Sequence, residues 1–175
     1  GARVVPVTGN ERVGVGSGLL GRVIDFQGAP LDSGGPIRTL NRVPIGGRNL
    51  NPLKRIPVNQ PLDVGVRSIN SLLAVGSGQR LGLFAPAGAG KSVLLSMMTQ
   101  FARADVVVVG LIGERGREVR EFVDSVRAAQ GMDNAVVVAV FSRCGSAGSV
   151  VDGFFNSILP GAARDRLVDW RAPGE

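Results

Sequence analysis

The apolar residues of this chain form runs and repeats that are typical of alternating strands and helices. Residues 105–112 and 135–141 are continuous valine-rich runs, as in strands that are buried on both faces of a parallel sheet. Between them lies a repeat with the i, i+3, i+4, i+7 spacing of an amphipathic helix. Its apolar residues are Val119, Phe122, Val123 and Val126. A further strand is predicted at residues 80–84 and a helix from 91 to about 102. This alternation predicts an α/β fold with a parallel, helix-covered sheet.

The N-terminal part of the chain has a different pattern. Residues 1–25 alternate short apolar pieces with glycine, which predicts short strands and tight turns. Residues 26–61 are rich in Gly, Pro and Asn without a sustained period, which predicts a long irregular connection. A short helix is expected after Asp63, and the Gly-Ser-Gly sequence at 76–78 should end it. We therefore expect the core at residues 62–141 and a divergent or truncated tail at 142–175.

Composition narrows the class of protein. Of the 175 residues, 44% are hydrophobic and 19% are charged, as is usual for soluble globular domains. The sequence has no histidine and a single cysteine, Cys144. This excludes histidine-ligated zinc sites, histidine-activated nucleophiles and an internal disulfide. No apolar run approaches the roughly 18 residues that cross a bilayer. Because the chain opens with Gly1 and its first methionine is Met97, we expect a fragment of a longer protein.

The net charge of +6 would suit a polyanionic partner, but the distribution of the basic residues does not. They are scattered along the chain, and few aromatic residues lie among them. Nucleic acid is therefore not an expected partner. Lysine occurs only at Lys54 and Lys91, whereas arginine is abundant, so the lysine at position 91 indicates a need for a compact ammonium group there.

A phosphate-binding motif follows the predicted strand at 80–84. The motif requires Gly, four free positions, and then Gly-Lys-Ser or Gly-Lys-Thr. The corresponding residues are Ala85, Pro86, Ala87, Gly88, Ala89, Gly90, Lys91 and Ser92, with alanine in place of the first glycine. Small residues let backbone N–H groups point at phosphate oxygens, and the next helix adds the positive end of its dipole. We expect Lys91 to neutralise the β- and γ-phosphates and Ser92 to bind Mg²⁺.

A second candidate for the site is Glu114, which follows the predicted strand at 105–112. Ligands of open parallel sheets bind beyond the carboxyl ends of the strands, so Glu114 and the phosphate loop should face one crevice. A carboxylate in that place can orient the water that attacks a γ-phosphate, and Arg115 can stabilise charge beside it. Spacing alone leaves the alternative that Glu114 only complements the dipole of the next helix.

Five segments of the chain resemble the ATPases of type III secretion systems and their flagellar-export counterparts. They are LLGRVID at 19–25, NPL at 51–53, LDVGVRSIN at 62–70, GQRLGLF at 78–84 and GLIGERGREV at 110–119. The resemblance covers about residues 15–125. That family is similar to the catalytic subunit of the F-type ATP synthase and tolerates alanine at the position of Ala85.

The resemblance implies a P-loop NTPase core like those of RecA and the F-type ATPases, preceded at 1–25 by the end of a small β-barrel. It implies ATP and Mg²⁺ as ligands, Glu114 as the catalytic carboxylate, and Lys91 and Arg115 as helpers at the phosphates. A full-length parent is expected to be a homo-hexamer at the cytoplasmic face of the inner membrane. Its expected partners are stalk and regulator proteins of the export apparatus, secretion chaperones and their substrates. Whether the apparatus is a virulence injectisome or a flagellum stays open.

The resemblance ends before the tail. The next core strand of the family ends in an aspartate that holds Mg²⁺ through water, and a neighbouring subunit supplies an arginine finger. Residues 142–175 match neither feature, and we expect this chain alone to be inactive. Two other functions stay open: an RNA-dependent hexameric helicase of the transcription-terminator type, and a nucleotide-binding or assembly fragment without turnover.

Overall fold

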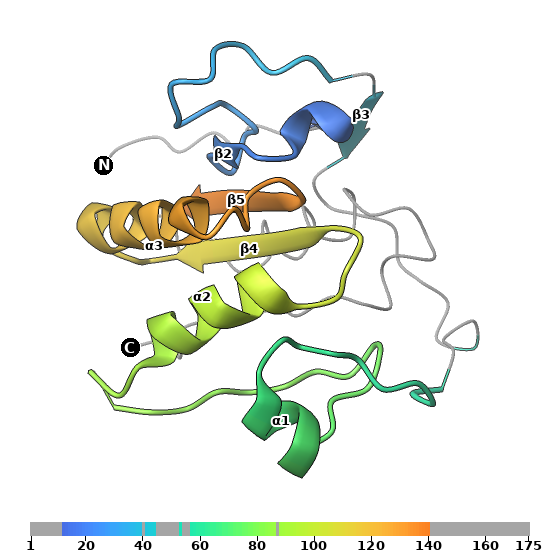
Figure 1. Ribbon diagram of the computed structural model, residues 1–175. Coiled ribbons are helices and arrows are strands. Elements are labelled where there is room, and N and C mark those ends of the chain that lie inside the picture. The colour runs from blue at the N-terminus through green and yellow to red at the C-terminus, as the bar shows by residue number, and fades with distance from the viewer. Residues whose placement is uncertain (1–11, 40, 45–52, 54–56, 87, 141–175) are drawn as a thin grey trace, which may run out of the picture.

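The computed structural model describes residues 12–39, 41–44, 53, 57–86 and 88–140. Figure 1 shows strands and helices in the order β1 (Arg12–Val15), a 3-10 helix η1 (Ser17–Leu19), β2 (Val23–Ile24), β3 (Asn41–Pro44), α1 (Arg67–Leu72), α2 (Lys91–Phe101), β4 (Val107–Ile112), α3 (Gly116–Ala128) and β5 (Ala135–Val140). Strands and helices alternate from α2 to β5, which confirms the predicted α/β class.

A three-stranded parallel sheet lies at the centre, in the order β2-β5-β4. Val107 pairs with Ala135 at one end of the β4–β5 ladder, and Ile112 pairs with Val140 at the other. All six residues of β5 are buried, because the sheet is covered on both faces. The continuous valine run of the sequence therefore indicated a strand with two buried faces correctly.

The two faces of β5 contribute to different cores. One face adds Val136, Val138 and Val140 to a cluster with the N-terminal segment, including the fully buried Val13 and Ile24. The residues of the other face pack against α3. They are Ala135, Val137 and Ala139. The period-two geometry of a strand thus separates an N-terminal core from a helical core.

The helix α3 carries the predicted apolar stripe. Its four periodic residues are all buried: Val119, Phe122, Val123 and Val126. Helix α2 packs beside α3. In Figure 1 the first turns of α2 and α3 lie at the end of the sheet that the arrowheads of β4 and β5 mark, on the left of the picture. This is the arrangement that parallel strands and their crossover helices impose.

A third core lies between α1 and α2. It contains Val64, Val66, Ile69, Val75 and Met98.

The loop before α1 passes very close to the end of α2. Gly65 has φ +76°, and a β-carbon there would lie 2.3 Å from the carbonyl carbon of Phe101. Only glycine meets both the positive φ and the close approach. Beside it, Arg103 N–H donates to the Asp63 carbonyl at 2.9 Å, so this loop fixes the C-terminal end of α2.

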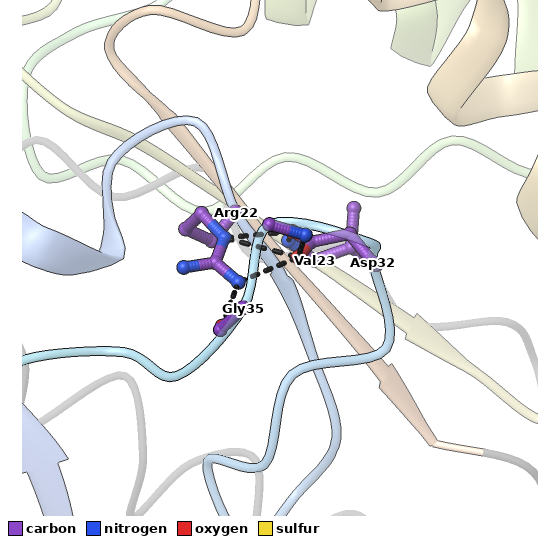
Figure 2. Close-up of polar contacts among 5 residues, drawn as sticks. Arg22, Val23, Asp32 and Gly35 are labelled. Atoms are coloured by element: carbon purple, nitrogen blue, oxygen red, sulfur yellow. Dashed lines mark hydrogen bonds and ion pairs between the residues drawn. The ribbon is translucent and has the colours of Figure 1, made fainter.

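The loop after β2 is attached to the sheet through Asp32, as Figure 2 shows. Its carboxylate accepts hydrogen bonds from the Arg22 guanidinium at 2.6 and 3.0 Å, from Val23 N–H at 2.8 Å and from Gly34 N–H at 3.0 Å. Arg22 also donates to the Gly35 carbonyl at 2.7 Å. The Arg22 and Asp32 side chains are 16% and 6% exposed. The hydrogen bond from Arg22 is the main reason that the pKa of Asp32 falls from 3.8 to about 2.

Several sequence predictions need correction. Residues 80–84 are not a strand, because no described strand pairs with them and an extended segment without a partner forms no ladder. Within the segment predicted to be irregular, β3 pairs with β1 in antiparallel fashion. From the segment predicted to form a separate β unit, β2 joins the central sheet beside β5. The limits of the domains stay a prediction.

The tail at 142–175 and Phe141 lie outside the described residues. Among the residues that the structure describes, no helix is both long enough and apolar enough to cross a membrane.

Candidate nucleotide-binding site

The phosphate loop leads directly into α2. Gly88 has φ +79°, and Gly90, the N-cap of α2, has φ +86°. Both conformations favour glycine, and a β-carbon at either position would meet open space. Glycine is therefore needed here for the shape of the backbone rather than for packing. Of the eight predicted loop residues, Ala87 lies outside the described part of the chain.

The N-terminus of α2 is suited to an anion. Within the described residues, no side chain caps this end of the helix, and its first turn holds no acidic residue. Pro86 and the residues 88–90 are exposed, and Ala85 is half-buried. The N–H groups at the start of a helix point outward and carry the positive end of its dipole. Within the loop Ala89 N–H donates to the Pro86 carbonyl at 3.3 Å, and the exposure of residues 88–90 leaves the start of α2 open to an anion.

One cavity brings the predicted groups together. Lys91 and Ser92 from α2 line it on one side, and Glu114 and Glu118 line it on the other. Its apolar walls are Leu95, Leu111, Val119 and Phe122. The cavity has a volume of about 40 Å³, which is room for an ion or a few waters and far below the roughly 300 Å³ or more of a nucleotide pocket. A nucleotide would extend from it over the exposed loop.

The carboxyl group of Glu114 has an unusual environment. Its pKa is raised first by burial, and then by a hydrogen bond to Glu118 and by the negative charge of that residue. The positive charge of Lys91 acts in the opposite direction. A raised pKa makes a carboxylate a better proton acceptor near neutral pH. Glu114 is therefore placed and tuned as a candidate base.

Arg115 was expected to stabilise charge beside Glu114. It is the N-cap residue of α3, it is exposed, and it is not among the residues that line the cavity. The structure thus brings Lys91, Ser92 and Glu114 together at one cavity. A role for Arg115 at the phosphates stays a prediction.

Glu118 is the residue that the sequence analysis missed. It lies in the first turn of α3 and lines the cavity. Glu118 follows Glu114 by four residues, but Glu114 precedes the N-cap Arg115 and lies outside α3, so the i, i+4 rule of helices does not predict that both line one cavity. Of the apolar wall residues, Val119 and Phe122 were predicted only as parts of a helical stripe.

The donor set fits a nucleotide with Mg²⁺. An ammonium group, a hydroxyl group and two carboxylates meet beside a helix N-terminus, and oxygen donors of this kind suit Mg²⁺ that is held mainly by phosphates. Among the described residues, no group of three or more Asp, Glu, Cys and His side chains could hold a metal by itself.

A glycine-containing loop lies at the N-terminus of α2, and a carboxylate faces it from the end of the parallel strand β4. This combination defines a nucleotide-binding domain of the P-loop class. The model of one family, described as "ATP synthase alpha/beta family, nucleotide-binding domain", matches residues 65–152, half of the chain. The chain belongs to this family.

Its relatives are ATPases of flagellar and type III export. It is 59% identical over 139 residues to the flagellum-specific ATP synthase of Pseudomonas aeruginosa. This alignment covers 79% of this chain and 31% of that protein. A solved ATPase from the type III secretion system of pathogenic bacteria matches with a TM-score of 0.71 and 36% identity, over 83% of this chain and 45% of that one. The assembled ATPase EscN of enteropathogenic E. coli matches with a TM-score of 0.66 and 40% identity, over 74% and 32%. The chain thus spans about a third of the length of the curated relatives it matches.

Proposed function

We propose that this chain is the nucleotide-binding part of an ATPase that energises protein export through a flagellar or type III apparatus. The observation that carries the proposal is the single cavity lined by Lys91, Ser92 and Glu114. The names of the relatives support the export branch of the family. None of these observations supports the helicase alternative.

The residues have separate tasks in this proposal. Backbone N–H groups of the loop and the ammonium group of Lys91 bind the phosphates, and the Ser92 hydroxyl contributes to the Mg²⁺ site. Glu114 accepts a hydrogen bond from the attacking water and orients it, and the raised pKa of this group strengthens the interaction. The apolar walls limit the access of bulk solvent to Glu114. Mg²⁺ supplies neutralisation of phosphate charge when it is bound.

The wider assembly is part of the same proposal. The relative described as an assembled ATPase supports a homo-oligomer, which we propose to be a hexamer. We propose a location at the cytoplasmic face of the inner membrane, with export chaperones, their substrates and the stalk and regulator proteins as partners. These features belong to the full-length parent.

The binding half of the proposal is tested by calorimetry with Mg²⁺-ATP. The wild-type chain should bind weakly, and Lys91→Ala should remove binding because it deletes the charge that faces the phosphates. Lys54→Ala, at the only other lysine of the sequence, is the matched control and should bind like the wild type. Equal affinities for the wild type and Lys91→Ala would refute the assignment.

The catalytic half is tested in the full-length parent. Glu114→Gln keeps the size of the side chain but weakens its pull on water, so ATP should still bind while turnover falls by about 10²-fold or more. If this variant hydrolysed ATP at the rate of the unsubstituted parent, Glu114 would not be catalytic and would only complement the dipole of α3. A parent that binds ATP and does not hydrolyse it would favour the alternative of a nucleotide-binding fragment without turnover.

A further inference from the structure

A small polar cluster connects the two helices that carry the halves of the site. The Ser96 hydroxyl on α2 lies 3.0 Å from the Ser125 hydroxyl on α3. The Gln100 amide, one turn further along α2, donates to the Ser96 hydroxyl at 2.9 Å and to the Ser125 carbonyl at 3.3 Å. Ser96 is 6% exposed. We call these three residues the interhelix cluster.

The surroundings of the cluster hold the helices close together. Gly131 follows α3 and faces Gln100, and a β-carbon on it would lie 3.1 Å from the α-carbon of Gln100 and 3.2 Å from a methyl group of Val126. A β-carbon there would require these neighbours to shift by a few tenths of an ångström. Close packing at Gly131 and the hydrogen bonds of the interhelix cluster therefore both hold α2 beside the C-terminal end of α3.

Both helices start at the cavity. Lys91 is the first residue of α2, and Ser96 follows it by five residues, which is about 7.5 Å along the axis. Glu114 directly precedes the N-cap residue of α3, the helix that carries Ser125, and Glu118 lies in its first turn. A rotation or a slide of α2 against α3 therefore changes the separation of Lys91 and Glu114.

Apolar contacts alone would not fix this relation well. Between α2 and the core of α3, Leu95 packs as a partly buried side chain, and such contacts tolerate small slides because they have no direction. Hydrogen bonds between paired hydroxyl and amide groups weaken quickly when angle or distance changes. The cluster thus supplies the directional part of the contact.

We infer that the interhelix cluster of Ser96, Gln100 and Ser125 positions Lys91 against Glu114. The three residues are positioning residues that act through the helices, and none of them lines the cavity. This inference deepens the proposed function and rests on it for its biological meaning. Its physical content, the separation of two charged groups, is measured without any nucleotide.

The experiment measures how strongly Lys91 acts on Glu114. The pKa of the Glu114 carboxyl group is determined by ¹³C NMR in the nucleotide-free chain, with and without Lys91→Ala. Removing the ammonium group should raise this pKa, because Lys91 lowers it in the wild type. The same pair of measurements is then made with Ser125→Ala in both proteins.

In the Ser125→Ala background the effect of Lys91→Ala on the pKa of Glu114 should be smaller than in the wild type, since Coulomb attraction falls with distance and with entering water. Gln100→Met, which removes the amide and keeps the length, should act in the same direction and replaces Ser125→Ala if that variant does not fold. Ser125→Thr keeps a hydroxyl group and should restore the wild-type effect.

The matched control is Thr99→Val. Thr99 is 4% exposed and also lies on α2, but its hydroxyl donates to the Leu95 carbonyl of its own helix at 2.9 Å. This variant should lower stability and leave the Lys91 effect unchanged. If Ser125→Ala and Gln100→Met also lowered stability and left the effect at its wild-type size, the cluster would be structural only and the inference would fall. Failure of nucleotide binding would instead refute the proposed function and leave this result intact.

Discussion

The ion pair of Arg22 and Asp32 should make a pH-dependent contribution to folding. Asp32→Asn removes the charge and keeps the shape. The pKa of the Asp32 carboxyl group is about 2 in the folded chain and 3.8 when the group has no partners. Since one pKa unit corresponds to about 1.36 kcal/mol, the charged form stabilises the fold by about 2 kcal/mol. Low exposure of both side chains keeps solvent screening small.

The sign of the pH dependence follows from the lowered pKa. The stabilisation is complete above the unfolded value of 3.8 and is lost as the pH falls from there through about 2. In urea unfolding followed by circular dichroism, the wild type should exceed Asp32→Asn by about 2 kcal/mol at pH 7 and by about 1 kcal/mol at pH 3. Other carboxyl groups titrate in both proteins and cancel in the difference.

Asp124→Asn is the matched control for this measurement. Asp124 pairs with Arg120 at 3.7 Å on the surface of α3, where the two side chains are 63% and 85% exposed. Such pairs contribute about 0.5 kcal/mol or less. The reasoning would be refuted if the two substitutions cost the same at pH 7, or if the Asp32→Asn difference did not narrow at pH 3.

Three further outcomes are expected. Gly65→Ala should lower the free energy of unfolding by about 2 kcal/mol or more, because it combines a positive φ with a clash against the Phe101 backbone; urea unfolding of this variant beside the wild type measures the loss. Val126→Ala should cost about 2 kcal/mol in the same assay, because the side chain is fully buried in the core under α3. Glu118→Gln should lower the pKa of Glu114 in an NMR titration, because it removes the neighbouring negative charge that raises it; an unchanged value would contradict the described pairing.

The sequence predicted the elements with strong local signals. The valine runs became β4 and β5 within two residues of their predicted ends, and the predicted apolar stripe lies within α3. The meeting of Lys91 and Glu114 was predicted from one topological rule, that ligands gather beyond the carboxyl ends of parallel strands. The rule holds for Glu114, which follows β4, whereas the phosphate loop follows residues that form no described strand.

Other features depend on partners far away in the chain, and no local pattern reveals them. β2 is two residues long and gains its place only by pairing with β5. The error at residues 80–84 has the same origin, because an apolar stretch predicts an extended backbone but not the presence of a neighbour. Glu118 lines the cavity from the first turn of α3. The pKa of Asp32 is low mainly because of its hydrogen bond with Arg22, ten residues before it.

The order β2-β5-β4 also affects how the chain reaches its fold. β5 comes last of the described strands along the chain, yet it is the middle strand of the sheet. Until β5 is present, β2 and β4 have no common neighbour, so neither can add its ladder to the sheet. On a ribosome, which releases the chain from its N-terminus, β2 and β4 must wait for residues 135–140 before the parallel sheet can close. Because the Val23–Val137 pairing spans more than a hundred residues, we expect sheet closure to be a slow, late step of folding.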